Sequence, residues 1–199
     1  MKTVLITGAN KGIGFETARQ LAQLGYFVYL GSRDKTRGLD AVNKLKSLGI
    51  SNVETVEIDV TNFDSIKQAR HILENKIGAL DVLINNAGIA AAQPQNISTG
   101  KMENLRKVFE TNFFGAIQTT QEFIGLLKES NEPRIVNVSS GLGSLTIHSN
   151  TQNSNFAIYD AYSCSKTALN AFTVLLAKEF RNTNFKINSV TPGYTATDL

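Results

Sequence analysis

Short apolar segments alternate along the chain with longer segments of helical periodicity, and this alternation limits the possible folds more than any other feature. Strands are expected at six places: Val4–Ile6, Phe27–Leu30, Val53–Ile58, Leu80–Ile84, Ile135–Val138 and Phe185–Val190. Helices are expected between them, over residues 15–24, Leu39–Leu48, Ser65–Lys76, Met102–Lys128 and Ala161–Arg181. Such an alternation is typical of a parallel sheet covered on both faces, wound by right-handed crossovers. The sequence therefore predicts a single α/β domain with a doubly wound parallel sheet, in which Ser144–Asn155 forms a long loop.

Composition narrows the class of protein. The 199 residues are 42% hydrophobic and 19% charged, which is ordinary for a globular domain. No run approaches the roughly 20 apolar residues that span a bilayer, so we expect no membrane association. The net charge of +3 is small and its basic residues are scattered, so nucleic-acid binding is not indicated. Cys164 is the only cysteine, and Met1–Thr7 leaves no room for a signal peptide, so we expect a cytoplasmic protein.

A glycine-rich segment joins the first expected strand to the first expected helix: Thr7-Gly-Ala-Asn-Lys-Gly-Ile-Gly14. Gly8 allows a tight turn, Gly12 lets the backbone approach a pyrophosphate, and Gly14 lets the helix pack close to the sheet. The helix N-terminus offers N–H groups and a positive dipole end to phosphates. Glycine turns without a ligand are common, so the position in the first βα unit carries the inference. We expect a Rossmann-type fold that binds a dinucleotide.

The end of the second expected strand indicates which dinucleotide is bound. NAD-binding proteins typically place a carboxylate there, about 20 residues past the glycines. This chain has Ser32, which can hydrogen-bond a phosphate, and Arg33, which can bind one bidentately. Lys11 adds a second cation, whereas Asp34 opposes a phosphate. The alternative is that Arg33 and Lys11 are solvated surface charges. We expect NADP(H) rather than NAD(H).

Tyr162 and Lys166 lie four residues apart, on one face of the last expected helix. The spacing alone is weak evidence, because about 0.3 such pairs are expected by chance. The chemistry is more informative. An ammonium ~4 Å from a phenolate stabilises it by about 4 kcal/mol at an effective dielectric of ~20. That energy lowers the phenol pKa by roughly three units from ~10, which makes Tyr162 a candidate for proton transfer near neutral pH.

Two serines, Ser139 and Ser140, end the strand that begins near Arg134. Ligands of open α/β sheets bind at the carboxyl ends of the strands, so both hydroxyls are placed to hydrogen-bond a substrate oxygen. Serines after a strand also form turns, and this alternative stays open for the pair on its own.

Taken together, these segments resemble the short-chain dehydrogenases/reductases. The matching motifs occur in family order along essentially the whole chain: Thr7-Gly-Ala-Asn-Lys-Gly-Ile-Gly14, Asp59-Val60, Asn85-Asn-Ala-Gly88, Asn112, Asn137-Val-Ser-Ser140, Tyr162-x-x-x-Lys166 and Pro192-Gly193. Within the family, Asn10–Gly14 and Ser32–Gly38 are most similar to NADPH-dependent carbonyl reductases.

The resemblance implies four catalytic residues. Tyr162 would be the acid when a carbonyl is reduced, and Lys166 would lower its pKa and hold the nicotinamide ribose. Ser140 would polarise the carbonyl, and Asn112 would hold a water in a proton relay. The residues expected to contact NADP(H) are Gly8, Asn10, Lys11, Gly12, Ile13, Gly14, Ser32, Arg33, Asp59, Val60, Asn86, Ala87, Gly88, Tyr162, Lys166, Pro192, Gly193, Thr195 and Thr197. Asp81 and Asn85 are expected to be structural, and no metal site is expected.

The chain differs from the family pattern in two places. Between Ser140 and Tyr162, residues Ile147–Ile158 form an apparent insertion. Larger insertions here cover the helix face that other members use to dimerise, so a monomer is plausible beside a homodimer. The chain also ends at Leu199, where family members continue into a substrate lid and a last strand.

The function expected from these features is NADPH-dependent reduction of an aldehyde, ketone or quinone to an alcohol, with Tyr162 as the general acid. One alternative is a non-catalytic NADP-binding or regulatory protein. The other is an alcohol dehydrogenase that works in the oxidative direction, because the same residues serve both directions.

Overall fold

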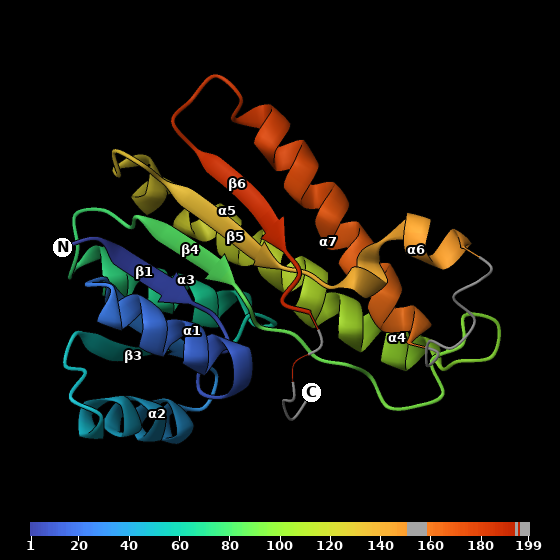
Figure 1. The fold of residues 1–199 in the computed structure, drawn as a ribbon, viewed down its shortest axis with the longest axis horizontal. Helices are drawn as coiled ribbons and strands as arrows, with labels where there is room; N and C mark the ends of the chain where they lie inside the picture. The colour runs from blue at the N-terminus through green and yellow to red at the C-terminus, as the bar shows by residue number, and fades with distance from the viewer. Residues whose placement is uncertain (151–158, 194, 196–199) are drawn as a thin grey trace.

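The computed structural model describes residues 1–150, 159–193 and 195, and it contains one six-stranded sheet in the order β3-β2-β1-β4-β5-β6 (Figure 1). Every strand pairs in parallel with its neighbours. The strands are β1 (Thr3–Ile6), β2 (Phe27–Ser32), β3 (Val53–Glu57), β4 (Val82–Asn85), β5 (Arg134–Val138) and β6 (Lys186–Val190). The order reverses between β1 and β4, and it confirms the predicted doubly wound, Rossmann-type sheet.

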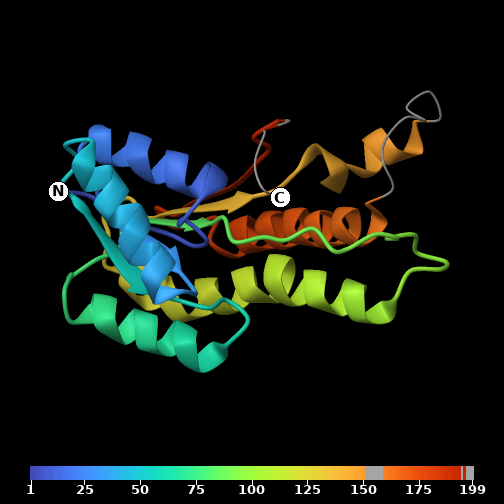
Figure 2. The ribbon, with the colours of Figure 1, turned by 90° about the horizontal axis from the view of Figure 1, so that it is seen from below.

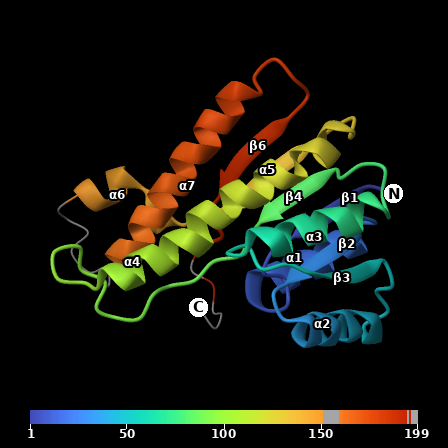
Figure 3. The same ribbon diagram turned by 180° about the vertical axis from the view of Figure 1, so that it is seen from behind.

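The helices flank this sheet on both faces. They are α1 (Gly12–Gln23), α2 (Lys35–Ser47), α3 (Phe63–Glu74), α4 (Met102–Phe109), the π-helical turn η1 (Glu110–Phe114), α5 (Gly115–Lys128), the 3-10 turn η2 (Gly141–Gly143), α6 (Leu145–Ser149) and α7 (Asp160–Glu179). Helix α1 lies on one side of the sheet, while α3, α5 and α7 lie on the other (Figures 2 and 3). Helix α2 packs into the same apolar cluster as α1.

Successive side chains of each strand point to opposite faces of the sheet, so each face has its own apolar core. On β1, Val4 and Ile6 join the cluster beneath α1 and α2. Leu5 joins the opposite cluster, which includes Phe123 of α5 and Ile135 of β5. Because both faces are covered, the central strands β1 and β4 are near-continuous apolar runs, whereas the edge strands β3 and β6 carry several polar residues. None of the helices that the structure describes is long and apolar enough to cross a bilayer.

Two expected elements differ from the structure. The single helix expected over Met102–Lys128 is interrupted at Glu110–Phe114 by η1, whose π geometry leaves the apolar periodicity almost unchanged. The loop expected over Ser144–Asn155 contains helix α6, which starts where the Ser144 hydroxyl accepts a hydrogen bond from the Ile147 N–H at 3.3 Å. Residues 151–158 of that loop lie outside the described residues.

The amino end of the sheet is held together by Asp81. Its carboxylate accepts hydrogen bonds from the Thr3 N–H at 2.7 Å and from the Ser130 hydroxyl at 2.6 Å. Asn85, at the other end of β4, donates to Asn137 at 2.8 Å and to Thr120 at 3.0 Å. These contacts join strands and helices that are distant in sequence, as expected for structural residues.

Candidate active site and cofactor groove

The glycine-rich loop between β1 and α1 adopts a backbone that side chains would disturb. Gly8 and Gly12 have left-handed φ angles of +63° and +59°. A Cβ on Gly14 would lie 2.5 Å from the amide nitrogen of Asn86, so this glycine allows α1 to approach the loop after β4. The first turn of α1, where Ile13 is half-buried, has no side-chain cap at its N-cap residue Lys11. A helix start of this kind suits a phosphate group.

An open groove of about 330 Å³ lies over the start of α1 and along α2. It is lined by Asn10, Lys11, Gly12, Phe15, Arg37, Asp40, Ala41 and Lys44. Three cations and one carboxylate make this groove positive, and the Lys44 ammonium lies 5.2 Å from the Phe15 ring. Arg37 was not predicted as a site residue, although its spacing of one helical turn from the exposed Arg33 was visible in the sequence.

In the turn between β2 and α2, the side chains of Ser32 and Asp34 make different contacts. The Ser32 side chain is buried, and its hydroxyl donates to the Asp34 carbonyl at 2.8 Å. The Asp34 carboxylate caps α2 by accepting the Arg37 N–H at 3.0 Å, and it also lies 3.6 Å from the Arg37 guanidinium. Asp34 is therefore engaged at the helix start and lies beside Arg37.

The loop after β4 is bound tightly to the glycine-rich loop. Asn86 donates from its side chain to the carbonyls of Thr7, at 2.9 Å, and Gly8, at 3.1 Å. The Thr7 hydroxyl accepts the N–H groups of Asn86 and Ala87, both at 3.0 Å. Thr7 is the first residue of the glycine-rich motif, but it was not predicted to be a site residue. These bonds bring the predicted Asn86–Gly88 segment to the expected edge of the sheet.

Asp59 and Val60 follow β3 at the same edge. The Asp59 carboxylate accepts hydrogen bonds from the Thr61 N–H at 2.9 Å and the Thr61 hydroxyl at 2.8 Å. Val60 is buried, and a Cβ on Gly115 would lie 2.8 Å from its Cγ2 atom. Both residues are thus fixed beside the start of α5, and their predicted contacts with adenine remain predictions.

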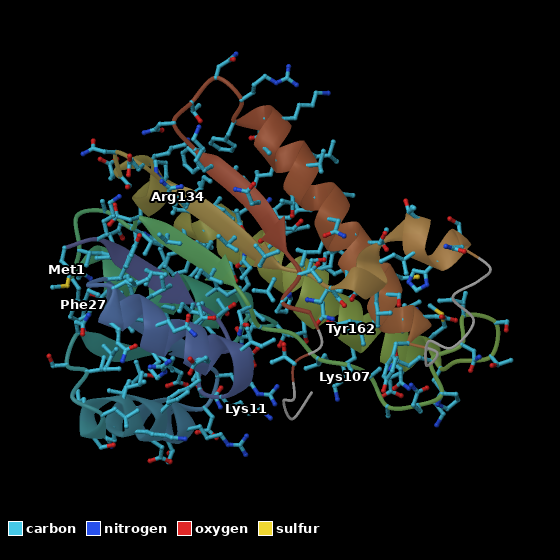
Figure 4. All side chains as sticks on the ribbon, in the orientation of Figure 1. Met1, Lys11, Phe27, Lys107, Arg134 and Tyr162 are labelled. Carbon is cyan, nitrogen blue, oxygen red and sulfur yellow. The ribbon has the colours of Figure 1, made fainter. Side chains whose placement is uncertain are left out.

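Tyr162 and Lys166 lie in the first half of α7, past the ends of β4 and β5; in Figure 4, Tyr162 and Lys11 appear on the side where the strands end. The Lys166 ammonium lies 5.6 Å from the centre of the Tyr162 ring and donates to the Val138 carbonyl at 2.7 Å. A Cβ on Gly88 would lie 3.6 Å from this ammonium. The predicted pair is therefore brought together with the loop after β4.

The proton affinities of the pair differ from the expectation. Burial raises the pKa of Tyr162, and a hydrogen bond with the Ser140 side chain lowers it by a smaller amount. We had expected Lys166 to lower this pKa, but its ammonium is directed to the Val138 carbonyl and is itself desolvated. Burial lowers the pKa of Lys166 to about 8. In this structure Tyr162 is thus held in its protonated form.

The two serines after β5 have different surroundings. Ser140 starts η2, where its hydroxyl accepts the Leu142 N–H at 3.2 Å, and it contacts the Tyr162 hydroxyl. The Ser139 hydroxyl is buried and has no hydrogen-bond partner within the described part of the chain. Ser140 is accordingly the serine that the structure places beside Tyr162.

Asn112 occupies the π-helical turn and is buried. Its side chain accepts the Ile89 N–H at 2.8 Å and donates to the Ile89 carbonyl at 3.0 Å. It also donates to the Ser165 hydroxyl at 3.1 Å. Its side chain thus joins the loop after β4 to α7. Ser165 was not predicted as a site residue. Its partner Asn112 lies 53 residues away in the sequence, so no local pattern indicates this contact.

The segment after β6 completes the set of predicted residues. Pro192 and Thr195 are exposed, and Gly193 has a left-handed φ of +77°. Thr197 lies outside the described residues.

Comparison with known proteins identifies the family. A family model described as short chain dehydrogenase matches residues 2–199, and the chain belongs to this family. The short-chain dehydrogenase anuI of Penicillium roqueforti is 38% identical over 202 residues, which cover 98% of this chain and 79% of that protein.

Two solved structures show the same fold at 28% identity each. The structure of salutaridine reductase from Papaver somniferum has a TM-score of 0.85, and the match covers 97% of this chain and 86% of that chain. A variant of actinorhodin polyketide ketoreductase solved with NADPH has a TM-score of 0.86, with 99% and 72% covered. The chain is accordingly similar to oxidoreductases.

Proposed function

We propose that this protein is an NADPH-dependent oxidoreductase that reduces a carbonyl compound to an alcohol, with Tyr162 as the general acid. The observation that carries the proposal is the grouping of the Tyr162 hydroxyl with Ser140 and the buried Lys166 ammonium. This group lies at the same edge of the sheet as the glycine-rich loop, where open α/β sheets bind their ligands.

The shape of the loop supports a bound dinucleotide. Gly8 and Gly12 keep side chains away from the helix start, and the uncapped first turn of α1 would hold the pyrophosphate. Asp59 and Val60 would hold the adenine, while Asn86–Gly88 would hold its ribose. Lys166 would bind the nicotinamide ribose, and Pro192–Thr195 the carboxamide.

The charges around the groove support NADPH over NADH. Arg33 is exposed at the end of β2, and Lys11, Arg37 and Lys44 line the groove beside it. A phosphate on the adenosine ribose would be attracted to these four cations, which outnumber the two neighbouring carboxylates, Asp34 and Asp40. A ketoreductase solved with NADPH is among the similar structures.

The protein's own residues would supply the proton and the orientation. NADPH, when bound, supplies the hydride. The Tyr162 hydroxyl would donate its proton to the substrate oxygen, and Ser140 would hold that oxygen by a hydrogen bond. Burial raises the pKa of Tyr162, which favours the protonated phenol that reduction requires.

Lys166 and Asn112 would complete the proton supply. With a pKa of about 8, Lys166 can give up a proton near neutral pH more readily than an exposed lysine. Both polar atoms of the Asn112 side chain are engaged with Ile89 and Ser165. Asn112 would hold a water of the proton relay in addition to these contacts, because its amide oxygen has a second lone pair.

The test is Tyr162→Phe, assayed by NADPH consumption with a panel of aldehydes, ketones and quinones. General acid catalysis contributes about 10² to 10⁴-fold, so kcat should fall by roughly 10³-fold while the Kd for NADPH is retained. Tyr26→Phe, distant from the site, serves as the matched control. Undiminished turnover in Tyr162→Phe would refute the mechanism. NADPH binding without turnover on any carbonyl would instead favour a non-catalytic protein.

A further inference from the structure

Gln95 is a buried polar residue in the loop between β4 and α4 that the proposed chemistry does not use. Its side chain is 2% exposed. The amide oxygen accepts the Tyr162 N–H at 3.2 Å, and the amide nitrogen donates to the Ala91 carbonyl at 2.7 Å. The Gln95 N–H is bound in turn by the Gln93 side chain at 3.1 Å. Gln95 therefore links the loop directly to the main chain of the proposed general acid.

The start of α7 requires such a partner. Tyr162 is the third residue of this helix, so its N–H has no carbonyl one turn earlier within the helix. The N-cap residue Tyr159 provides no side-chain cap. A buried N–H without an acceptor is destabilising, and Gln95 supplies the acceptor from 67 residues away in sequence. The contact is thus a helix cap provided by a different part of the chain.

The carbonyl of Tyr162 is held from the same loop by a second route. The Ser165 hydroxyl donates to this carbonyl at 2.7 Å. Ser165 also accepts a hydrogen bond from Asn112, whose side chain binds both polar main-chain atoms of Ile89. Ile89 and Gln95 are six residues apart, so one short segment is connected to Tyr162 through its N–H and through its carbonyl.

We propose that Gln95 is a positioning residue that fixes the main chain of Tyr162 and thereby sets the place of its hydroxyl relative to Ser140. This inference rests on the proposed function, because it assigns Gln95 a role through Tyr162. The segment from Ile89 to Gln95 follows Gly88, which lies beside Lys166. Movement of this segment on the substrate side of the sheet is therefore transmitted to the general acid. Proton transfer is sensitive to displacements of well under an ångström to about 1 Å, so loss of the cap affects catalysis before it affects cofactor binding.

The experiment compares Gln95→Met with Gln68→Met. Methionine has nearly the same length as glutamine but cannot accept the Tyr162 N–H. Gln68 is an exposed glutamine of α3 and serves as the matched control. We expect kcat in Gln95→Met to fall about tenfold, as for the loss of one orienting contact, with an unchanged KM for NADPH. A merely structural role would lower the melting temperature and leave kcat unchanged, and that result would overturn the proposal.

A conservative variant and a measurement without turnover complete the test. Gln95→Glu keeps an oxygen at the acceptor position, and its carboxyl, when protonated, can still donate to Ala91. Its kcat relative to wild type should recover at acidic pH and fall as pH rises, whereas Gln95→Met stays uniformly low. Amide hydrogen exchange of the first turn of α7 should be faster in Gln95→Met. Unchanged exchange in Gln95→Met would refute the tether, whether or not the wild type reduces a carbonyl. Faster exchange in a protein that reduces no carbonyl would keep the tether and refute the proposed function alone.

Discussion

Replacing Lys166 by methionine is expected to make the protein more stable at neutral pH while removing its activity. The Lys166 side chain is 3% exposed, and within the described part of the chain its ammonium donates to the Val138 carbonyl. Burial lowers its pKa from an ordinary 10.5 to about 8. At pH 7 the ammonium is charged in both the folded and the unfolded protein, and the folded state is destabilised by keeping that charge out of water.

The size of the effect follows from the pKa shift. A shift of this size corresponds to about 3 kcal/mol, since each pKa unit is about 1.4 kcal/mol. Methionine cannot donate to the Val138 carbonyl, which offsets about 1 kcal/mol. A net stabilisation of about 2 kcal/mol remains, which corresponds to roughly 4 to 8 °C in Tm for a chain of this length.

The difference in stability between wild type and Lys166→Met depends on pH. Between the folded pKa of about 8 and the unfolded value of 10.5, the unfolded wild type binds more protons than the folded one. Wild-type stability therefore rises with pH in this window relative to Lys166→Met. The variant's advantage is full below pH 8 and is lost as pH approaches 10.5.

Urea unfolding at pH 7 and at pH 10.5 measures the difference, with the exposed Lys178→Met of the same helix as the matched control. NADPH consumption measures the activity, which should be lost in Lys166→Met and kept in Lys178→Met. If Lys166→Met is less stable than wild type at pH 7, or if its advantage is independent of pH, the assigned desolvation of Lys166 is wrong.

Three further substitutions test other parts of the structure. Arg33→Ala should weaken NADPH binding about tenfold or more and leave NADH binding unchanged in fluorescence titrations, because it removes a contact to a charged phosphate; equal loss for both would contradict the NADPH assignment. Gly14→Ala should lower the unfolding free energy by about 1–3 kcal/mol in urea, because its Cβ would lie 2.5 Å from the Asn86 amide. Wild-type stability there would show that the two loops are not tightly packed. Asp81→Ala should lower stability by about 1–3 kcal/mol, since the Thr3 N–H loses its acceptor, while the KM for NADPH is unchanged. A changed KM would place Asp81 in the cofactor site.

Local sequence patterns predicted the parallel sheet and the glycine-rich loop that follows β1. The glycine-rich loop was predictable because left-handed φ angles at Gly8 and Gly12 require glycine. The central strands β1 and β4 were predictable because burial on both faces leaves few polar positions. The place of Ser139 and Ser140 at the carboxyl end of β5 followed from the rule that ligands of open α/β sheets bind at that edge, whereas the contact of Ser140 with Tyr162 was not predicted.

The remaining features depend on contacts between distant residues. The π-helical turn at Asn112 inserts into an apolar pattern that reads as one helix. The cap that Gln95 provides for Tyr162 joins residues 67 positions apart, and no local motif marks it. The direction of the Tyr162 pKa was also not accessible from spacing. Spacing places Lys166 near the phenol, but burial of the phenol raises its pKa and the Ser140 side chain lowers it by a smaller amount.

The two ends of the sheet differ in how well their buried polar groups are hydrogen-bonded. At the amino end, both carboxylate oxygens of Asp81 accept hydrogen bonds. At the carboxyl end, the described residues include three buried side-chain atoms without a partner, in Asn85, Ser139 and Asn170. The buried Lys166 ammonium lies at this end too. Each such group lowers stability, so their concentration at one edge is expected where polar groups are arranged for a ligand rather than for the fold. Lys166→Met tests this conflict between stability and function directly. The substitution removes from this edge the charge on which the proposed proton transfer depends, and it should thereby stabilise the protein.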